Sequence, residues 1–345
     1  MKKLITIMSL AVVGFTFAQE EEPTFKVSGS IDAYFHTSLN GPNDVPAGLV
    51  DGAFSSAPSA IMGNDDRGFS GANANVRFSY EGEKVGFIAD MAYGPRTAQF
   101  SDFDVVNEAY MYWNASEKVT LMMGRWNSWM GYEKFAAADN FHYSYSHQYT
   151  FGPRNMNGLA AQFSLGNDFN LGLGLMNPIE TTEGNTSGDY SIAAGISKGD
   201  HGISFLSSQD ETFVDVKTKI NFTDSFSLAL NGNFGSWDND AVLTGNRALL
   251  TGTEGYMSIS GYTQLQSSEA FAWGIRLEYF NIMESEGDDT NVITPTLTGN
   301  YSVGNFTIRP ELRLDSASED IFWNSDADDV QGGLSTFTLA AIYSF

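Results

Sequence analysis

The strongest constraint in this chain is a strict alternation of apolar and polar residues that recurs in one segment after another. In residues 306–315, Ile308, Pro310, Leu312 and Leu314 fall on one face, and Arg309, Glu311, Arg313 and Asp315 fall on the other. Residues 214–222 and 271–279 repeat the pattern. Because successive side chains of a β-strand point to opposite faces, these segments predict strands with one apolar and one ionic face.

Weaker copies of the alternation bring the expected number of strands to about 16, most of them near the roughly 9 to 11 residues that a tilted transmembrane strand requires. These copies occupy residues 25–36, 73–81, 85–93, 106–114, 119–132, 158–165, 169–176, 190–198, 202–208, 226–234, 255–265, 291–301 and 335–345. An even count of such strands is typical of a transmembrane barrel.

The connections between these segments alternate in length. Short polar turns lie at 82–83, 115–117, 166–168, 198–201, 223–225, 267–268 and 302–304. Longer or more acidic connections lie at 40–70, 94–104, 133–157, 178–188, 209–211, 237–253, 284–290 and 316–332. This layout predicts an all-β, antiparallel, up-and-down transmembrane barrel with short periplasmic turns and long extracellular loops. The alternative, a soluble exported β-sandwich, has shorter strands and no reason to alternate its loop lengths.

The N-terminal residues have the pattern of a secretory signal peptide. Lys2 and Lys3 precede an apolar stretch, and the small residue Ala18 precedes an acidic run. A membrane anchor is the alternative, but the stretch is shorter than the roughly 20 apolar residues of a spanning helix. We therefore expect a signal peptide at 1–18 and a single barrel domain at 19–345, exported to the outer membrane of a Gram-negative-type bacterium.

Charge and cysteine content exclude several classes of function. The chain has 18 Lys and Arg against 42 Asp and Glu, a formal net charge of -24, and no cysteine. Such an acidic chain without a basic cluster repels phosphate backbones, which argues against nucleic acid as a partner. The absence of cysteine excludes disulfides, cysteine-ligated metals and a cysteine nucleophile.

The polar strand faces predict the lining of a pore. The expected cations are Lys26, Arg77, Arg125, Lys217, Lys219, Arg276, Arg309 and Arg313, and the expected anions are Asp32, Glu81, Asp90, Glu108, Asp215, Glu278, Glu311 and Asp315. A charge-balanced lumen in a barrel of this size predicts a water-filled channel, with the charge deficit carried by acidic extracellular loops. The alternative is that these charges form cross-strand pairs that only stiffen a solvated wall.

Loop 133–157 is unusually aromatic for a solvated connection. Its candidate residues are Phe135, Asp139, Phe141, His142, Tyr143, Tyr145, His147, Tyr149 and Phe151. We expect it either to fold inward and constrict the pore or to pack on the rim as an aromatic belt. Two histidines near Asp139 leave a barrel-rim hydrolase as a minor alternative, although no catalytic, metal-binding or cofactor-binding motif is present.

Several of these motifs resemble one family. The motifs are Asn107–Tyr110, Gly124–Asn127, Gly131–Glu133, Asp139–Ser144, Phe151–Pro153, Ile308–Asp315 and Ala340–Phe345. In these stretches the chain resembles the putative β-barrel porin-2 family of outer-membrane proteins. The resemblance implies an outer-membrane, porin-like barrel whose terminal aromatic residue serves as an assembly signal, and it brings no catalytic residues.

The function expected from the sequence is passive diffusion of small hydrophilic solutes or ions. The expected partners are outer-membrane lipid, the transported solutes, and the barrel-assembly machinery acting on the C-terminal strand that ends at Phe345. A homo-oligomer is left open. The alternative function is a closed outer-membrane barrel that acts as a binding or structural surface protein.

Overall fold

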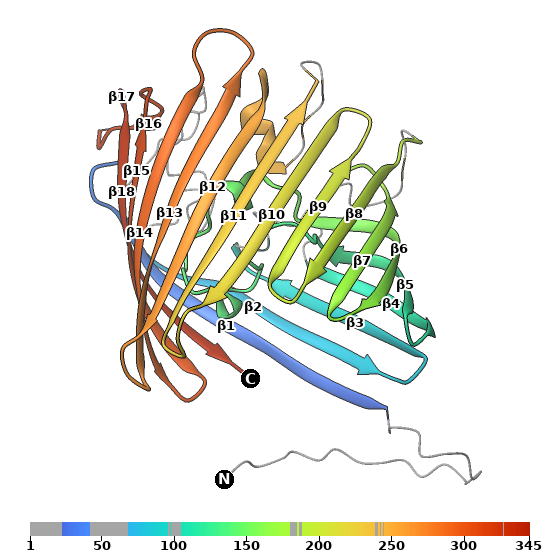
Figure 1. The fold of residues 1–345 in the computed structure, drawn as a ribbon. Helices are drawn as coiled ribbons and strands as arrows, with labels where there is room; N and C mark the ends of the chain where they lie inside the picture. The colour runs from blue at the N-terminus through green and yellow to red at the C-terminus, as the bar shows by residue number, and fades with distance from the viewer. Residues whose placement is uncertain are drawn as a thin grey trace, which may run out of the picture.

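Sixteen strands of the described residues close into one antiparallel barrel in the computed structural model (Figure 1). The structure describes residues 23–41, 68–95, 97, 105–179, 185, 188–238, 241, 243, 245–326 and 328–345. The expected signal peptide and most of loop 40–70 lie outside these ranges. Each strand pairs with its neighbour in sequence, and β18 closes the barrel between β15 and β1. The prediction of an antiparallel barrel of about 16 strands is confirmed.

The barrel strands are β1 (Thr24–Ser38), β2 (Gly68–Glu81), β3 (Val85–Tyr93), β4 (Val106–Ser116), β5 (Val119–Asn127), β6 (Asn155–Gly166), β7 (Phe169–Met176), β8 (Ser191–Lys198), β9 (His201–Ser207), β10 (Glu211–Asn221), β11 (Phe226–Trp237), β12 (Thr253–Gln266), β13 (Phe271–Glu284), β14 (Thr290–Val303), β15 (Phe306–Ala317) and β18 (Gly333–Ser344). A small hairpin of β16 (Phe322–Trp323) and β17 (Val330–Gln331) lies in the last long connection. Three helical segments lie wholly within the described residues: η1 (Ala137–Asp139), α2 (His147–Phe151) and η2 (Gly245–Leu250). Among the described residues, no helix has the length and apolar character needed to cross a membrane.

The two faces of each barrel strand differ in exposure as the alternation predicts. On β14, Thr294, Thr296 and Thr298 are fully buried, whereas Ile293 and Leu297 are about half exposed. The buried polar positions face the interior and the exposed apolar positions face outward, where a membrane barrel contacts hydrocarbon. The inner surface is therefore polar.

The two rims of the barrel also differ. Turns such as 167–168, 199–200 and 304–305 are only two residues long, and they lie at the rim where the C-terminus is found (Figure 1). Exposed aromatic side chains gather near the strand ends at this rim, namely Phe25, Phe222, Phe271, Tyr301, Phe306, Tyr343 and Phe345. An aromatic girdle at the hydrocarbon boundary is typical of transmembrane barrels.

A charged residue introduced on the outer face should destabilise the barrel according to its depth. We expect Leu312→Arg, in the middle of β15, to lower the free energy of unfolding by about 2 to 4 kcal/mol because the guanidinium would face hydrocarbon. Val303→Arg, at the end of β14, should cost only about 0 to 1 kcal/mol. Denaturant unfolding in lipid bilayers measures both variants, and equal losses would contradict this placement of the outer face.

Candidate functional site inside the barrel

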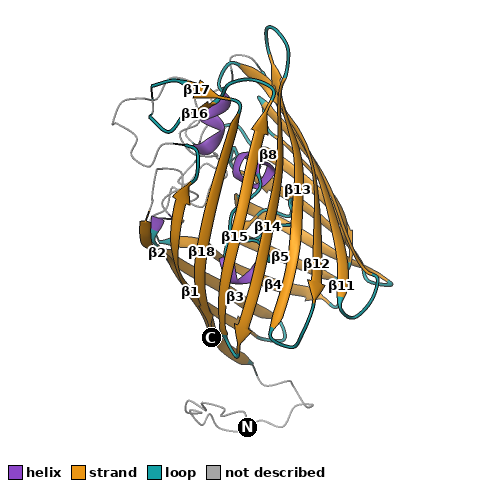
Figure 2. Ribbon diagram, turned by 90° about the vertical axis from the view of Figure 1, so that its left-hand side faces the viewer, coloured by secondary structure: helices purple, strands orange, loops and turns teal. Residues whose placement is uncertain are grey.

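The connection between β5 and β6, residues 128–154, turns back into the barrel and carries η1 and α2 with it (Figures 1 and 2). We call these residues the inward segment. Its side chains are buried as in a protein core, since Tyr143, Tyr145 and Phe151 are at most 1% exposed. Irregular backbone at membrane depth is tolerated only where its N–H and C=O groups find partners. The inner wall of the barrel supplies many of these partners.

Glu311 on β15 binds two successive backbone amides of the inward segment. The amide of Tyr143 donates to its Oε2 atom at 2.7 Å, and the amide of Ser144 donates to its Oε1 atom at 2.8 Å. The Thr298 hydroxyl on β14 adds a third hydrogen bond at 2.8 Å. A carboxylate engaged in this way is held in one orientation, and charge-assisted bonds of this kind are stronger than neutral ones.

Glu278 on β13 repeats this arrangement at the start of α2. The amides of His147 and Gln148 donate to its two carboxylate oxygens at 2.8 and 2.9 Å. Ser146 caps the same helix, because its hydroxyl accepts the amide of Tyr149 at 3.2 Å. The first amides of a helix have no partner within the helix, so wall and cap together satisfy them.

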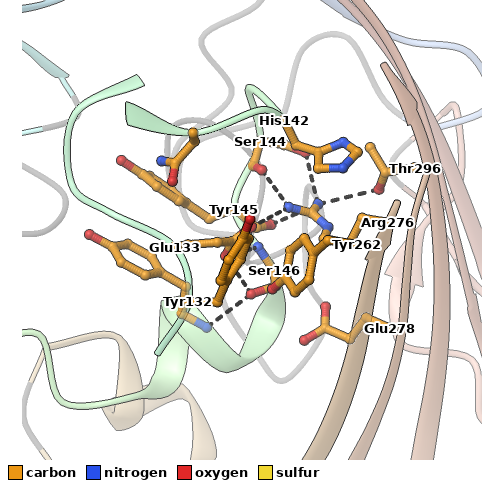
Figure 3. A network of polar contacts seen from close by, with 12 residues as sticks. Tyr132, Glu133, His142, Ser144, Tyr145, Ser146, Tyr262, Arg276, Glu278 and Thr296 are labelled. Atoms are coloured by element: carbon orange, nitrogen blue, oxygen red, sulfur yellow. Dashed lines mark hydrogen bonds and ion pairs between the residues drawn. The ribbon is translucent and has the colours of Figure 1, made fainter. Parts of the chain in front are cut away.

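Arg276 on β13 binds backbone carbonyl oxygens of the inward segment and also Glu133, the buried acid of that segment (Figure 3). Its guanidinium donates to the carbonyl oxygens of Ser144 and Tyr145 at 2.6 and 3.2 Å, and to Thr296 on β14 at 3.3 Å. It also forms an ion pair with Glu133 at 2.7 Å. The planar guanidinium suits such a role because it presents several donors in a fixed geometry.

Two further arginines on β15 act in the same way. Arg309 donates to the carbonyl oxygen of Ala137 at 2.9 Å, and Arg313 donates to that of Tyr145 at 2.6 Å. Wall carboxylates therefore bind amides of the inward segment, and wall guanidiniums bind its carbonyls. We call this set of contacts on β13–β15 the latch.

Both histidines of the inward segment are buried within the latch. His142 is 2% exposed, and burial together with the nearby guanidiniums of Arg276 and Arg309 holds its pKa well below the usual range. It is therefore neutral at neutral pH. His147 lies 3.0 Å from the carboxylate of Asp315 through its Nε2 atom.

The inward segment also touches the opposite wall. Trp129 lies over Gly172 on β7, where a Cβ atom would come within 3.1 Å of the indole ring. The ammonium of Lys217 on β10 donates to the carbonyl oxygens of Trp129 and Gly131 at 2.8 and 2.9 Å. The segment thus reaches across the interior, although its densest polar contacts are with β13–β15.

Six of the sixteen residues expected to line a pore belong to the latch and are at most 4% exposed because the inward segment covers them; these are Arg276, Glu278, Arg309, Glu311, Arg313 and Asp315. Asp32 on β1 also binds the segment, accepting the Tyr143 hydroxyl at 2.6 Å. The sequence pattern predicted that these side chains share the inner face. It did not show that they would bind the backbone of a loop.

The remaining predicted residues lie elsewhere on the wall. A cluster on β2–β5 holds the ion pair of Arg77 and Glu108, with Asp90 accepting the Asn107 amide at 2.7 Å and Arg125 donating to the Asn107 carbonyl at 3.2 Å. The predicted residues at the short-turn ends are the pair Lys26 and Glu81, 2.9 Å apart, and Lys219. That any of these residues lines a conducting pathway stays a prediction, as does constriction by the aromatic loop.

The sequence reasoning missed several polar residues of the site. Glu133 falls in a loop, where alternation carries no information, and the wall charges were already balanced without it. Asn231 and Asn233 on β11 point inward and bind Asp215, but only charged residues were counted on the polar faces. Counting amides along with charges would have found these two asparagines. No comparable signal was available for Gln148.

The interior retains open space beside the inward segment. One small space lies between the segment and β10–β11 and includes Lys134, Gln148, Asp215 and Asn231 in its lining. A larger one, open to solvent, lies at the short-turn rim next to Lys219. Both spaces border β10 and β11, where the segment makes fewer polar contacts than it does with β13–β15.

Comparison with known proteins agrees with this architecture. The family described as "Putative beta-barrel porin-2, OmpL-like" matches residues 24–345. None of the curated proteins matches the chain.

Solved structures of outer-membrane proteins are similar in fold at low sequence identity. The outer membrane channel DcaP of Acinetobacter baumannii is 12% identical, with 97% of this chain and all of that chain covered and a TM-score of 0.61. The anion-selective porin from Comamonas acidovorans is 10% identical, with 94% and 100% covered and a TM-score of 0.61. A trimer form of OmpT from Vibrio cholerae is 9% identical, with 94% and 100% covered and a TM-score of 0.56.

The latch predicts which amides each carboxylate protects. Glu311→Gln removes the charge but keeps the size of the side chain, and hydrogen bonds to charged groups contribute about 1.5 to 3 kcal/mol. We expect the amides of Tyr143 and Ser144 to exchange with deuterium about tenfold faster or more, as measured by hydrogen-exchange mass spectrometry or NMR of the refolded protein.

Glu278→Gln is the matched control for this experiment. It should accelerate exchange at His147 and Gln148 and leave Tyr143 and Ser144 nearly unchanged. If both variants accelerated all four amides equally, the carboxylates would not act as separate anchors.

Proposed function

The chain belongs to the OmpL-like putative β-barrel porin-2 family, and from this premise we propose that it is a passive outer-membrane channel for small hydrophilic solutes or ions. The observation that carries the proposal is a closed barrel of sixteen strands among the described residues, with a polar inner face and one loop latched inside it. A barrel of about 16 strands is wide enough for an aqueous channel, which a loop fixed inside would narrow rather than fill.

Weak cation preference is part of the proposal. Most of the charge of -24 falls on the long connections, for example at 284–289 and 319–329. Such a field raises the local concentration of cations and disfavours anions, and salt screens it. The similar structure from Comamonas acidovorans is titled an anion-selective porin, so the fold alone does not set the sign of selectivity.

Export and assembly follow the same proposal. Residues 1–18 would be removed as a signal peptide, leaving a single barrel domain at 19–345 in the outer membrane of a Gram-negative-type bacterium. The barrel-assembly machinery would recognise the C-terminal strand β18 and the Phe345 that follows it, which exchanges two 3.0 Å backbone hydrogen bonds with Gly29 on β1. A homo-oligomer is consistent with the trimer form reported for the OmpT structure.

A closed barrel that serves as a binding or structural surface is the second candidate function. Two contacts favour it, that of Trp129 with Gly172 on β7 and that of Lys217 on β10 with the Trp129 carbonyl, because they show the inward segment touching both sides of the interior. A barrel-rim hydrolase has less support. His142 is bonded to Thr298 at 2.7 Å and His147 to Asp315 at 3.0 Å, so both rings are engaged in holding the segment.

The channel proposal predicts single-channel currents. Full-length mature protein, refolded and inserted into a planar bilayer, should give stable open steps. Its reversal potential in a salt gradient should show a cation preference that fades at high salt as the acidic rim is screened. Silence from protein that shows β-rich, heat-modifiable folding would overturn the channel and favour the closed barrel.

The inward segment should tune selectivity through Lys134, an exposed cation beside the open space. We expect Lys134→Glu to raise the cation-to-anion permeability ratio about twofold or more, because it reverses a charge inside a focused field. Lys118→Glu makes the same charge change in the β4–β5 turn and should have a smaller effect. Equal shifts in the two variants would place the selectivity outside the segment.

A further inference from the structure

We propose that the hollow at the short-turn rim, next to Lys219, binds a small sugar acid, a solute that combines a carboxylate with a hydroxylated ring. The hollow lies between the inner wall of β10–β13 and Phe141 of the inward segment, and it is open to solvent at the rim. Its volume of about 460 Å³ falls within the range of small-molecule sites. It is separate from the latch, because no latch carboxylate or guanidinium is among the described residues that line it.

Phe141 provides an aromatic surface at the edge of the inward segment. Its ring is seated against Gly274 on β13, where a Cβ atom would come within 2.8 Å of the ring. Its carbonyl oxygen accepts the side-chain amide of Asn300 at 3.0 Å, which fixes the backbone at this point. The ring is half-buried and borders the hollow. It suits the apolar C–H face of a sugar ring, since small-molecule sites combine aromatic surface with a few well-placed polar groups.

Three polar side chains from adjacent strands form a row across the inner wall of the hollow. Asn221 on β10 pairs with Ser227 on β11, and Ser227 pairs with Gln264 on β12. Directly paired residues of neighbouring strands point to the same face, so two amides and a hydroxyl lie side by side. All three line the hollow and are at least partly exposed. Amides and hydroxyls both donate and accept hydrogen bonds, as the hydroxyl groups of a sugar do.

Lys219 on β10 is the reason for expecting a carboxylate on the solute. It lies two residues from Asn221 on the same inner face, and its side chain is half-buried at the hollow. In the part of the chain that the structure describes, it takes part in no ion pair. An ammonium group has three donors, and its hydrogen bonds to a carboxylate are about twice as strong as those between neutral groups. Lys219 therefore favours an anionic solute over a neutral one.

Asp224 also lines the hollow and opposes this preference in part. It is exposed on the turn between β10 and β11, where solvent and salt weaken its field more than that of a half-buried group. The acidic long connections lie at the opposite rim, and a Debye length of about 8 Å at physiological salt screens them from the hollow. Among the described lining residues, the half-buried charge is therefore that of Lys219.

This inference deepens the proposed channel function, and it rests on that function only for the way a solute reaches the hollow. Binding to refolded protein in detergent micelles is independent of conductance. A barrel that binds the sugar acid without conducting would overturn the channel and keep the site. A conducting barrel that fails to bind it would do the reverse.

The test compares glucuronate with glucose, which has a hydroxymethyl group in place of the carboxylate, and with acetate, which has the carboxylate without the ring. Isothermal titration calorimetry at constant ionic strength and about pH 7 keeps both acids ionised. We expect saturable glucuronate binding at least about tenfold tighter than that of either glucose or acetate. Equal affinity for glucose would show that Lys219 adds nothing, and equal affinity for acetate would show that the polar row and the ring of Phe141 add nothing. Either result, or no binding of any of the three, overturns the proposal.

Lys219→Met should remove the difference between glucuronate and glucose, because it deletes the ammonium group at nearly constant length. Lys198→Met is the matched control and should leave binding unchanged, since the Lys198 ammonium lies 4.9 Å from the centre of the Phe169 ring and Lys198 does not line the hollow.

Asp224→Asn should strengthen glucuronate binding about twofold, because it removes the opposing charge from an exposed position. Weaker binding in this variant would contradict the placement of the anion. If Lys219→Met does not fold, Asp224→Asn and the three ligands on the unmodified protein still decide the proposal.

Discussion

The structure depends on satisfying the backbone of the inward segment inside the barrel. A peptide that enters the interior carries backbone N–H and C=O groups, and burying these groups without hydrogen-bond partners costs free energy. Glu278 and Glu311 accept its amides, and Arg276, Arg309 and Arg313 donate to its carbonyls. Carboxylates on the wall thus act as hydrogen-bond acceptors and guanidiniums as donors, which explains why both signs of charge alternate with apolar residues on these strands.

The same strands must also suit hydrocarbon on their outer face, and the pleat of the strand makes the two demands compatible. Leu312 is exposed on the outside while its neighbours Glu311 and Arg313 hold the inward segment. Between these long side chains, the short hydroxyl side chains of Thr296 and Thr298 keep the wall polar and project little from it. The segment can therefore lie directly against β14. A shift of the register by one residue would place charges in lipid and leave the segment without anchors.

The sequence predicted the barrel well because alternation is set by the geometry of a single strand, as residues 306–315 show. It predicted which face holds Arg276 and Glu311, but not their partners, because these come from a loop some 130 to 170 residues away. The aromatic content of 133–157 indicated packing without choosing between rim and interior. Glu133 and Gln148 were missed because a loop has no period, and their positions are fixed by tertiary contacts alone.

The distribution of these contacts makes the interior asymmetric. On β13–β15 the charged groups of the wall bind the backbone of the segment, although Arg276 Nε and His142 Nε2 are buried there without a hydrogen-bond partner among the described residues. On β10–β11, Asp215 accepts the side-chain amides of Asn231 and Asn233, and Lys217 donates to carbonyl oxygens of the segment. The segment is therefore anchored mainly by β13–β15, and the other side of the interior is joined to it by fewer contacts, those of Trp129 and Lys217 among them.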